Sequence, residues 1–349
     1  MSLKKLRLII LTVGIAAAAV SCKKDEDTQT SPTLDGILTF SSPEFLIKDG
    51  TLTMTPKGVT HPEGGIIGYY WKVVPGMDKY DTTRFANGLN TKDETGVESD
   101  GTFTHSFKEG LDTYTIYCYA FAKGYTGSSC TRYVTTVAPG RRGSVTGAYL
   151  GEQVTVNGQT WTAHNCHESA GSPFRKADVM SDVFGRYYNY EQAIAACDAL
   201  QSDDPAFKWC LPSEEDWIAL GTSLGGTTEA DKHEPVTGIA KKLMVDALFN
   251  GNKMWEYWPA VGHITNESNM SVIPVGYANL GEMAEDGSYP SASFTNLYKA
   301  AAFWTSTEVE DNESMAYYRY LRSDEPDLFV GKGDKLSLGA SVRCIRKPV

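Results

Sequence analysis

The spacing of apolar residues changes along this chain, and that change constrains the possible folds more than any other feature of the sequence. From residue 34 to about residue 139, short segments rich in β-branched and aromatic residues alternate apolar with polar positions, and Gly, Pro, Asp and Asn separate them. Such alternation is typical of half-buried strands. Farther on, Tyr190, Ala193 and Cys197 recur at the spacing of one helical face. Because 349 residues are also too many for one ordinary core, we expect an all-β domain followed by an α+β domain.

The first 22 residues, MSLKKLRLIILTVGIAAAAVSC, predict where the protein resides. A basic start precedes an apolar run from Leu8 to Val20, which is too short and wrongly flanked for a membrane-spanning helix and therefore indicates an export signal over residues 1–21. Its end resembles a bacterial lipobox, which implies that Cys22 is lipidated and becomes the mature N-terminus. An ordinary secretory signal cut nearby is the alternative.

Residues 22–33 are polar and lack apolar periodicity, so they predict a flexible tether. A Lys followed by acids directly after the lipidated cysteine resembles the surface-export signal of Bacteroidetes-type lipoproteins. We therefore expect a protein anchored in the outer membrane by its N-terminal lipid and exposed on the cell surface. The formal net charge of −11 disfavours nucleic acid as a partner, because binding to phosphates needs a basic patch.

Six segments between residues 34 and 140 predict strands, and that number is typical of a two-sheet sandwich. The segments are GILTFSS (36–42), TLTMTP (51–56), GYYWKVV (68–74), GTFTHSF (101–107), TYTIYCYAFA (113–122) and TRYVTTVAP (131–139). The arrangement resembles PKD or fibronectin-type Ig-like modules, which implies a buried central Trp71 and a corner role for Tyr114. We find no catalytic pattern here and expect a spacer or adhesion module.

Cys118 and Cys130 flank the turn KGYTGSS (123–129) of this region. If the hairpin centres near Gly124, the two residues face each other on neighbouring strands. Disulfides persist in exported proteins, so we predict a cross-strand bridge, with two thiols as the alternative.

The segment PGRRGSV (139–145) is the predicted boundary, and a domain of residues 145–349 follows it. Asn157-Gly158 predicts a type I′ hairpin turn within 149–166. His164, Cys166 and His167 could hold a metal, but no second cluster of ligand spacing accompanies them, so we expect neither metal nor cofactor.

The stretch WCLPSEEDW (209–217) contains three consecutive acids and raises the question of catalysis. Pro212 excludes a helix interior, Ser213 is a good N-cap, and Asp216 stands at the capping-box position. The acids at 214–216 would then lie at the positive end of the helix dipole, where each contributes roughly 0.3–1 kcal/mol. We interpret the stretch as a helix start; a catalytic or metal role is the alternative.

Four motifs in order along residues 145–349 make this half of the chain similar to the Fibrobacter succinogenes major paralogous domain. They are GRYYNYEQAIAACDAL (185–200), WCLPSEEDWIALGTSLGG (209–226), AAFWTSTEVED (301–311) and SVRCIRK (341–347). Cys210 and Cys166 depart from the family, which usually has His or Arg at the first position and an apolar residue at the second. The resemblance implies a fold related to C-type lectins and formylglycine-generating enzymes.

Four cysteines in this half allow three disulfide connectivities, and spacing alone cannot choose among them. The resemblance implies Cys197–Cys344, since both are positions where the family itself has cysteines. It leaves Cys166 and Cys210, the two departures, as a second pair.

These observations favour a non-enzymatic surface protein that acts in binding or adhesion, with a glycan, a host protein or a surface protein as ligand. One alternative is an enzyme of the formylglycine-generating type, but the last eighty residues contain one cysteine, Cys344, where that chemistry needs a reactive pair. The other is a calcium-dependent lectin, since 325–327 (Glu-Pro-Asp) resembles a sugar-binding tripeptide, although no Trp-Asn-Asp follows. For a sugar platform the aromatic candidates are Trp255, Trp258, Tyr277 and Tyr289.

Overall fold

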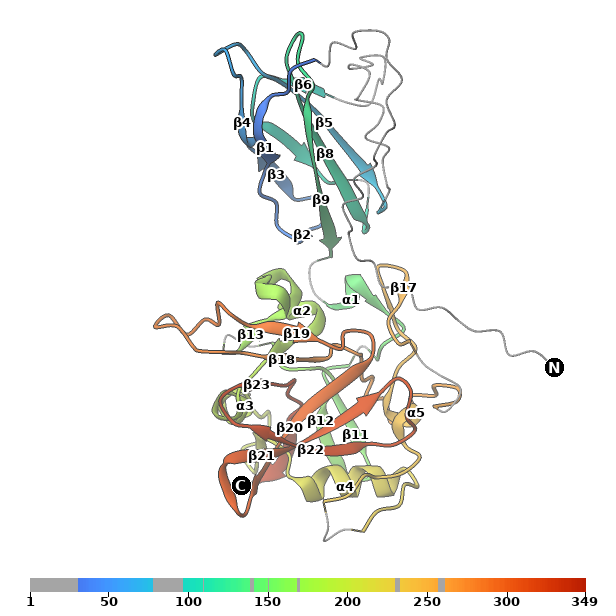
Figure 1. Ribbon diagram of the computed structural model, residues 1–349. Helices are drawn as coiled ribbons and strands as arrows, with labels where there is room; N and C mark the ends of the chain where they lie inside the picture. Colours follow the sequence, from blue (N-terminus) through green and yellow to red (C-terminus); the bar gives the residue numbers. More distant parts are fainter. Residues whose placement is uncertain are drawn as a thin grey trace, which may run out of the picture.

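The computed structural model describes residues 31–77, 97–108, 110–138, 141–149, 151–167, 170–229, 233–256 and 261–349. The predicted signal peptide, Cys22, most of the tether and Trp258 lie outside these residues. Strand is the dominant secondary structure, and the chain forms an N-terminal region (residues 31–138) and a C-terminal region (residues 141–349), one above the other in Figure 1. None of the helices within the described residues has the length and apolar character that crossing a membrane requires.

The N-terminal region consists of strands, as its alternating segments predict. They are β1 (Asp35–Thr39), β2 (Phe45–Ile47), β3 (Thr51–Met54), β4 (Lys57–Thr60), β5 (Gly68–Pro75), β6 (Val97–Ser99), β7 (Phe103–Ser106), β8 (Thr113–Phe121) and β9 (Ser128–Val137). One sheet has the order β2-β9-β8-β5-β6, and the pairs β1-β4 and β3-β7 form two smaller sheets. All six predicted segments are confirmed as strands, whereas the short strands β2, β4 and β6 were not predicted.

An aromatic and aliphatic core lies beneath these sheets. Trp71 on β5 is fully buried, with Phe40 in edge contact at 5.0 Å and Phe103 stacked at 5.4 Å between ring centroids. Tyr114 is also buried and donates its hydroxyl hydrogen to the Gly110 carbonyl at 3.1 Å. The strands therefore enclose Trp71, whose central burial the resemblance to Ig-like modules implied.

The C-terminal region has short helices and many short strands. The helices are α1 (Arg141–Ser144), α2 (Ser181–Phe184), α3 (Tyr190–Asp198), α4 (Glu214–Ser223) and α5 (Ala240–Leu243), with 3-10 turns η2 (Phe174–Lys176) and η3 (Asp178–Met180). The strands are β10 (Val145–Thr146), β11 (Gln153–Val156), β12 (Gln159–Thr162), β13 (Ser172–Pro173), β14 (Arg186–Tyr187), β15 (Phe207–Cys210), β16 (Leu248–Phe249), β17 (Asn252–Lys253), β18 (Tyr277–Asn279), β19 (Ser293–Thr295), β20 (Ala300–Val309), β21 (Asn312–Arg322), β22 (Phe329–Asp334), β23 (Leu338–Gly339) and β24 (Ile345–Pro348).

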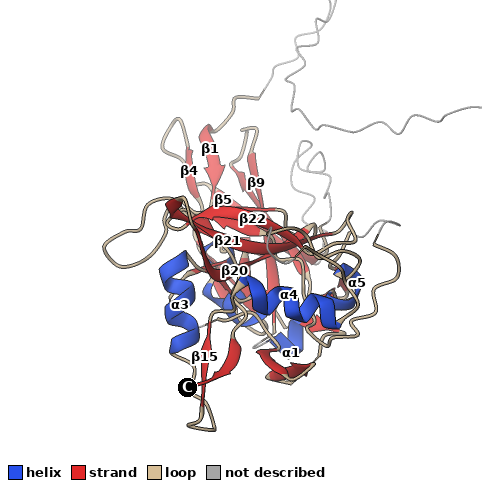
Figure 2. Cartoon of the chain, turned by 90° about the horizontal axis from the view of Figure 1, so that it is seen from below, coloured by secondary structure: helices blue, strands red, loops and turns tan. Residues whose placement is uncertain are grey.

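Two sheets organise this region. The sheet β11-β12-β24-β15 pairs the beginning of the region with its end, and Asn157 and Gly158 form the predicted β11–β12 turn with φ of 47° and 80°. The antiparallel sheet β20-β21-β22 lies beside the helices α3 and α4 (Figure 2). Because side chains alternate along β20, Phe303 packs on Trp217 of α4 and Trp304 on Tyr190 of α3, at 5.4 and 5.7 Å between centroids. The two helices therefore cover opposite faces of that sheet.

The two regions share a packed boundary. Phe45 of the N-terminal region lies 5.9 Å from Phe174 of the C-terminal region, between ring centroids, and Val137 joins the same apolar cluster. Asn250 donates its side-chain amide hydrogen to the Thr136 carbonyl at 2.8 Å. These contacts hold the end of β9 against the C-terminal region.

Candidate functional site

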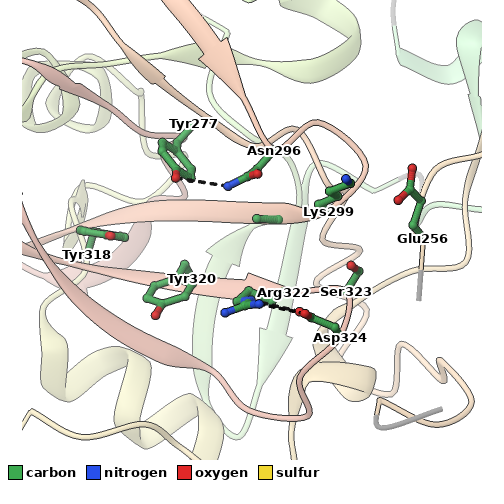
Figure 3. A pocket seen from close by; sticks show the side chains of 10 residues that line it. Glu256, Tyr277, Asn296, Lys299, Tyr318, Tyr320, Arg322, Ser323 and Asp324 are labelled. Carbon is green, nitrogen blue, oxygen red and sulfur yellow. Dashed lines mark hydrogen bonds and ion pairs between the residues drawn. The ribbon is translucent and has the colours of Figure 1, made fainter. Parts of the chain in front are cut away.

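A cleft of about 460 Å³ opens on the α3 side of the β20-β21-β22 sheet, at the end of the sheet that α3 leaves uncovered. We call it the tyrosine cleft (Figure 3). It is lined by Glu256, Tyr277, Asn296, Lys299, Ala300, Tyr318, Tyr320, Arg322, Ser323 and Asp324.

Strand alternation places three of these side chains in one row. Tyr318, Tyr320 and Arg322 are alternate residues of β21, so they point to the same face of the sheet. On the neighbouring strand β20, Ala302 pairs with Tyr320 and Ala300 pairs with Arg322. Because these partners are alanines, the space beside the tyrosine and the arginine stays open.

A glycine on the other neighbouring strand makes room for the first tyrosine. Gly331 of β22 pairs with Tyr318, and a Cβ atom at Gly331 would lie 2.5 Å from the Tyr318 ring. Phe329, the partner of Tyr320, has its ring stacked with that tyrosine at 5.3 Å between centroids. Tyr318 and Tyr320 are themselves 5.6 Å apart between centroids, so the cleft has a continuous aromatic wall.

The opposite face of β21 is held in place by a buried ion pair. Arg319 is fully buried, and its Nε and Nη2 atoms donate to the two carboxylate oxygens of Glu214 at 2.9 and 2.6 Å. Its Nη1 atom donates to the Glu234 carbonyl at 2.9 Å. This bidentate pair ties β21 to the start of α4, so the strand that carries the tyrosines has a rigid support.

The tyrosine hydroxyl groups of the cleft can form hydrogen bonds with a ligand. Burial, together with the nearby Tyr320 and Tyr277, holds the pKa of Tyr318 above its ordinary value. Its phenol therefore stays protonated at neutral pH and can both donate and accept a hydrogen bond. Asn296 donates its amide hydrogen to the Tyr277 hydroxyl at 3.2 Å, which orients that second tyrosine (Figure 3).

The charged groups of the cleft balance one another. Arg322 forms a bidentate pair with Asp324, with donor–acceptor distances of 3.0 and 2.8 Å. Lys299 and Glu256 add one charge of each sign at the far end (Figure 3). The cleft thus combines aromatic surface with several hydrogen-bonding groups and has no excess of either sign.

The acid-rich stretch 209–217 begins a helix, as predicted. Ser213 is the N-cap of α4 and forms a capping box with Asp216. The pKa of Glu215 lies below its ordinary value, and the largest cause is a hydrogen bond from the Ser213 side chain. Glu214 differs from the expectation, because it is 1% exposed and pairs with Arg319 rather than with the helix end alone. Its role as a buried ion-pair partner could not be predicted, since the arginine lies 105 residues away.

The aromatic candidates for a sugar platform have different environments. Tyr277 lies in the tyrosine cleft. Trp255 is 2% exposed and donates its indole hydrogen to the Val272 carbonyl at 3.1 Å, so it is a core residue and not part of a platform. Tyr289 is also buried, and its hydroxyl group bonds Asn189 and Gln192 at the start of α3.

Tyr318 and Tyr320 were not among the sequence candidates. The sequence signal that could have identified them is the run YYRYLR (317–322), in which aromatic and basic side chains occupy alternate positions of a strand.

The cysteine predictions are confirmed in part. Cys197 and Cys344 form a disulfide with 5.5 Å between their Cα atoms, as predicted. Cys118 and Cys130 face each other in the β8–β9 register, but both are thiols, so the predicted cross-strand bridge is not present.

The predicted Cys166–Cys210 pair is wrong in this structure. Cys210 pairs with Ile345 in the β15–β24 register and packs on the core that contains Trp161, whereas Cys166 packs with Cys344 in another core cluster. Cys344, the residue before β24, lies in the cluster with Cys166, whereas its neighbour Ile345 lies in the cluster with Trp161, so the two residues face apart. The sheet itself therefore separates the two cysteines, which the sequence could not reveal.

Two further candidate sites remain, the 325–327 tripeptide and the histidines at 164 and 167. Asp327 accepts a hydrogen bond from the Gly238 amide at 2.8 Å, and the Pro326 carbonyl accepts one from Ala240, so the 325–327 tripeptide joins two loops. His164 and His167 do not belong to the group of ligand-type side chains that the described residues bring together, which is Cys166, Cys197 and Cys344.

Comparisons with known proteins give one family. The search of curated proteins finds no match. A solved structure, the superoxide reductase (neelaredoxin) from Ignicoccus hospitalis, is similar at 12% identity over 30% of this chain and 82% of that chain, with a TM-score of 0.20, which is too low to support an argument. The family model of the Fibrobacter succinogenes major domain matches residues 154–346, more than half of the chain and the entire span of the tyrosine cleft. The chain therefore belongs to the Fibrobacter succinogenes major domain family.

Proposed function

We propose that this protein is a lipid-anchored protein of the bacterial outer membrane, exposed at the cell surface, that binds glycans in the tyrosine cleft without catalysing a reaction. The observation that carries the proposal is the combination of three tyrosines and four charged side chains around one opening of about 460 Å³. Ligand pockets of this size are typically apolar and aromatic, with a few polar groups that fix orientation. Sugars match such a cleft, because their C–H faces stack on aromatic rings and their hydroxyls exchange hydrogen bonds with charged side chains.

The charge balance of the cleft favours neutral glycans. Lys299 and Arg322 are offset by Glu256 and Asp324, so an anionic sugar would meet as much repulsion as attraction. The Arg322–Asp324 pair offers donors and acceptors side by side, which suits neighbouring hydroxyls on one sugar ring. We therefore expect binding to change little between low and high salt.

The N-terminal region suits the role of a spacer. Thr33, where the chain enters the region, pairs with Thr126 in the β8–β9 turn, and β9 then leads to the other end, next to the C-terminal region. Ten residues of strand span roughly 30 Å. We interpret this region as an Ig-like module, supported by the strands that pack around the buried Trp71 and by the Tyr114 hydrogen bond to Gly110.

We likewise interpret the C-terminal region as related to C-type lectins. Its first hairpin and its last strand share the sheet β11-β12-β24-β15, and the Cys197–Cys344 disulfide ties α3 to the residue before β24. A lectin-like fold with an aromatic cleft favours binding over catalysis. The calcium-dependent alternative receives no support from Asp327, whose carboxylate accepts from the Gly238 amide.

The enzyme alternative also lacks support from the cysteines. Cys344 is bonded to Cys197, and Cys166 is buried beside them, whereas a reactive thiol is typically exposed and near a positive charge.

A glycan array with the soluble fragment 31–349 tests the proposal. We expect binding to neutral oligosaccharides that survives a calcium chelator. In Tyr320→Ala the affinity should fall about tenfold, equivalent to ~1.4 kcal/mol, because one stacking surface is lost.

The matched control is Tyr133→Ala, which removes a tyrosine of the N-terminal region that is 43% exposed. Equal affinities of wild type and Tyr320→Ala, or binding abolished by chelation, would contradict this site assignment.

Anchoring is tested separately in cells. Cys22→Ser should release the protein from membranes or block its processing, and palmitate labelling should disappear. Labelling that survives this substitution would rule out the lipid anchor. Protease added to whole cells should digest the wild-type protein if it faces outward.

A further inference from the structure

Three cysteine sulfurs meet in the core of the C-terminal region. The Sγ atoms of Cys166, Cys197 and Cys344 all lie within 4.8 Å of one another. Cys197 and Cys344 form the disulfide, and the Cys166 Sγ atom lies 3.4 Å from the Cys344 Sγ atom. Cys344 therefore has two cysteines within reach, and it is bonded to only one of them.

Backbone hydrogen bonds hold Cys166 in this place. Its amide donates to the Val342 carbonyl, and its carbonyl accepts from the Arg186 amide, both at 2.9 Å. Nearby, the Thr162 amide donates to the Cys344 carbonyl at 2.8 Å, and the Cys344 amide donates to the Thr162 hydroxyl at 3.0 Å. The proximity of the two sulfurs is thus a consequence of how the 162–166 segment lies along residues 342–344.

We propose that Cys166 is a second disulfide partner of Cys344, so that the residue before β24 can be tied either to α3 or to the 162–166 segment. In the exchange, the Cys166 thiolate attacks the Cys344 sulfur, a Cys166–Cys344 bond forms and the Cys344–Cys197 bond breaks. Cys197 leaves as a thiolate and takes up a proton, which replaces the one that Cys166 gave up. The number of disulfides and thiols stays the same, so no external oxidant or reductant is consumed.

The two bridges are nearly equivalent in chain entropy. The Cys197–Cys344 bridge joins residues 147 apart, and a Cys166–Cys344 bridge would join residues 178 apart. Loop-closure entropy depends on the logarithm of loop length, so this difference barely separates them. Local packing then decides which one predominates, and the structure contains the bridge to α3.

Disulfide exchange would remove the covalent link that holds α3 to the rest of the region. The start of α3 is held to other segments by side chains, since Asn189 donates to the Tyr289 hydroxyl at 3.0 Å and Tyr190 donates to the Ser306 carbonyl at 2.9 Å. With Cys197 released, only such non-covalent contacts would hold the helix. All three cysteines are buried, and the attacking sulfur must be a thiolate, so exchange in the folded protein should be slow at neutral pH and faster at alkaline pH.

The first experiment removes the present partner. Cys197→Ser, oxidised during folding, should contain a Cys166–Cys344 bridge, detected as a linked peptide after digestion without reduction. Cys210→Ser, the matched control, should keep the Cys197–Cys344 bridge. A Cys344 that is alkylated in the folded Cys197→Ser protein would overturn the proposal.

The second experiment decides the matter if Cys197→Ser does not fold. Wild-type protein is incubated at alkaline pH with an alkylating reagent that traps released thiols. We expect alkylated Cys197 together with a Cys166–Cys344 linked peptide, and neither product in Cys166→Ser. Wild-type protein that retains only the Cys197–Cys344 bridge, with Cys197 never alkylated, would refute the exchange.

Discussion

The N-terminal and C-terminal regions differ in what holds their segments together. In the N-terminal region, long neighbouring strands pair along most of their length, and the core beneath them is aromatic and aliphatic. In the C-terminal region, the described residues between α4 and β18 contain only short elements. There the structure buries charged side chains, among them Glu214, Arg319 and Arg343.

In the irregular segments of the C-terminal region, buried arginines supply hydrogen bonds of the kind that strand pairing supplies in the N-terminal region. Arg319 donates to the Glu234 carbonyl, and the Nη1 atom of Arg343 donates to the Met270 and Thr162 carbonyls at 3.0 and 3.2 Å. Glu234 and Met270 lie in irregular segments, and Thr162 is the last residue of β12. A buried carbonyl without a partner is costly, so a guanidinium with several donors can stabilise a loop in the way that a ladder stabilises a strand.

Removing the disulfide should have the largest effect on stability, and this effect should be confined to the C-terminal region. Cys344→Ala removes both possible bridges, and for a loop of 147 residues the chain-entropy model predicts a loss of about 5 kcal/mol. Hydrogen exchange measured by mass spectrometry should show lower protection in α3 and β24, with protection in β8 and β9 unchanged.

Cys197→Ser is the informative comparison, because Cys166 can replace the lost partner. We expect it to lose clearly less stability than Cys344→Ala. Equal losses in the two variants would mean that Cys166 does not replace Cys197.

The next effect in size comes from the buried ion pair. Glu214→Gln should lower the free energy of unfolding of the C-terminal region by about 3 kcal/mol, since it leaves the fully buried Arg319 without its charged partner. Urea unfolding followed by hydrogen exchange measures this loss. Glu215→Gln, one residue along the same helix turn, is the matched control and should cost less than ~1 kcal/mol.

Equal effects of the two substitutions would mean that the Arg319 pair contributes nothing beyond the helix dipole. The result would also make the two regions more alike in what stabilises them, because apolar burial would then be the main source of stability in both.

The same contrast explains which features could be predicted from the sequence. Local patterns are confirmed: the strands 68–74 and 113–122, the Asn157-Gly158 turn and the Ser213 cap each depend on residues close in the chain. Features that depend on distant residues were missed. The tyrosine cleft needs Tyr277 of β18 and the tyrosines of β21 to line one opening, although the two strands belong to different sheets. The separation of Cys166 from Cys210 depends on the two faces of a sheet whose strands come from both ends of the region.

The helix cap provides a smaller effect. Ser213→Ala should cost about 1 kcal/mol, because the hydroxyl accepts from the Asp216 amide at 3.3 Å and no other acceptor replaces it. Thermal unfolding of the C-terminal region measures the loss. Ser213→Asp should restore most of it, since Asp caps equally well; a Ser213→Ala protein as stable as wild type would show that packing alone fixes the start of α4.

The smallest expected effect is the ionisation of Tyr190, which becomes visible only in alkali. Burial, and after it the Glu308 carboxylate, raises the pKa of Tyr190 to about 12. An unfolded tyrosine ionises near pH ~10, so the folded chain holds this proton more tightly. The resulting stabilisation is complete below pH ~10 and is lost as the pH rises to about 12.

Tyr190→Phe cannot ionise, so its unfolding free energy should fall less steeply than that of the parent protein across this interval. Urea titrations at several pH values measure the two slopes, best in a Cys166→Ser background that cannot exchange its disulfide. Tyr133→Phe, at an exposed site of the N-terminal region, should follow the parent curve. If Tyr190→Phe also follows it, ionisation of this buried phenol does not limit the alkaline stability of the C-terminal region.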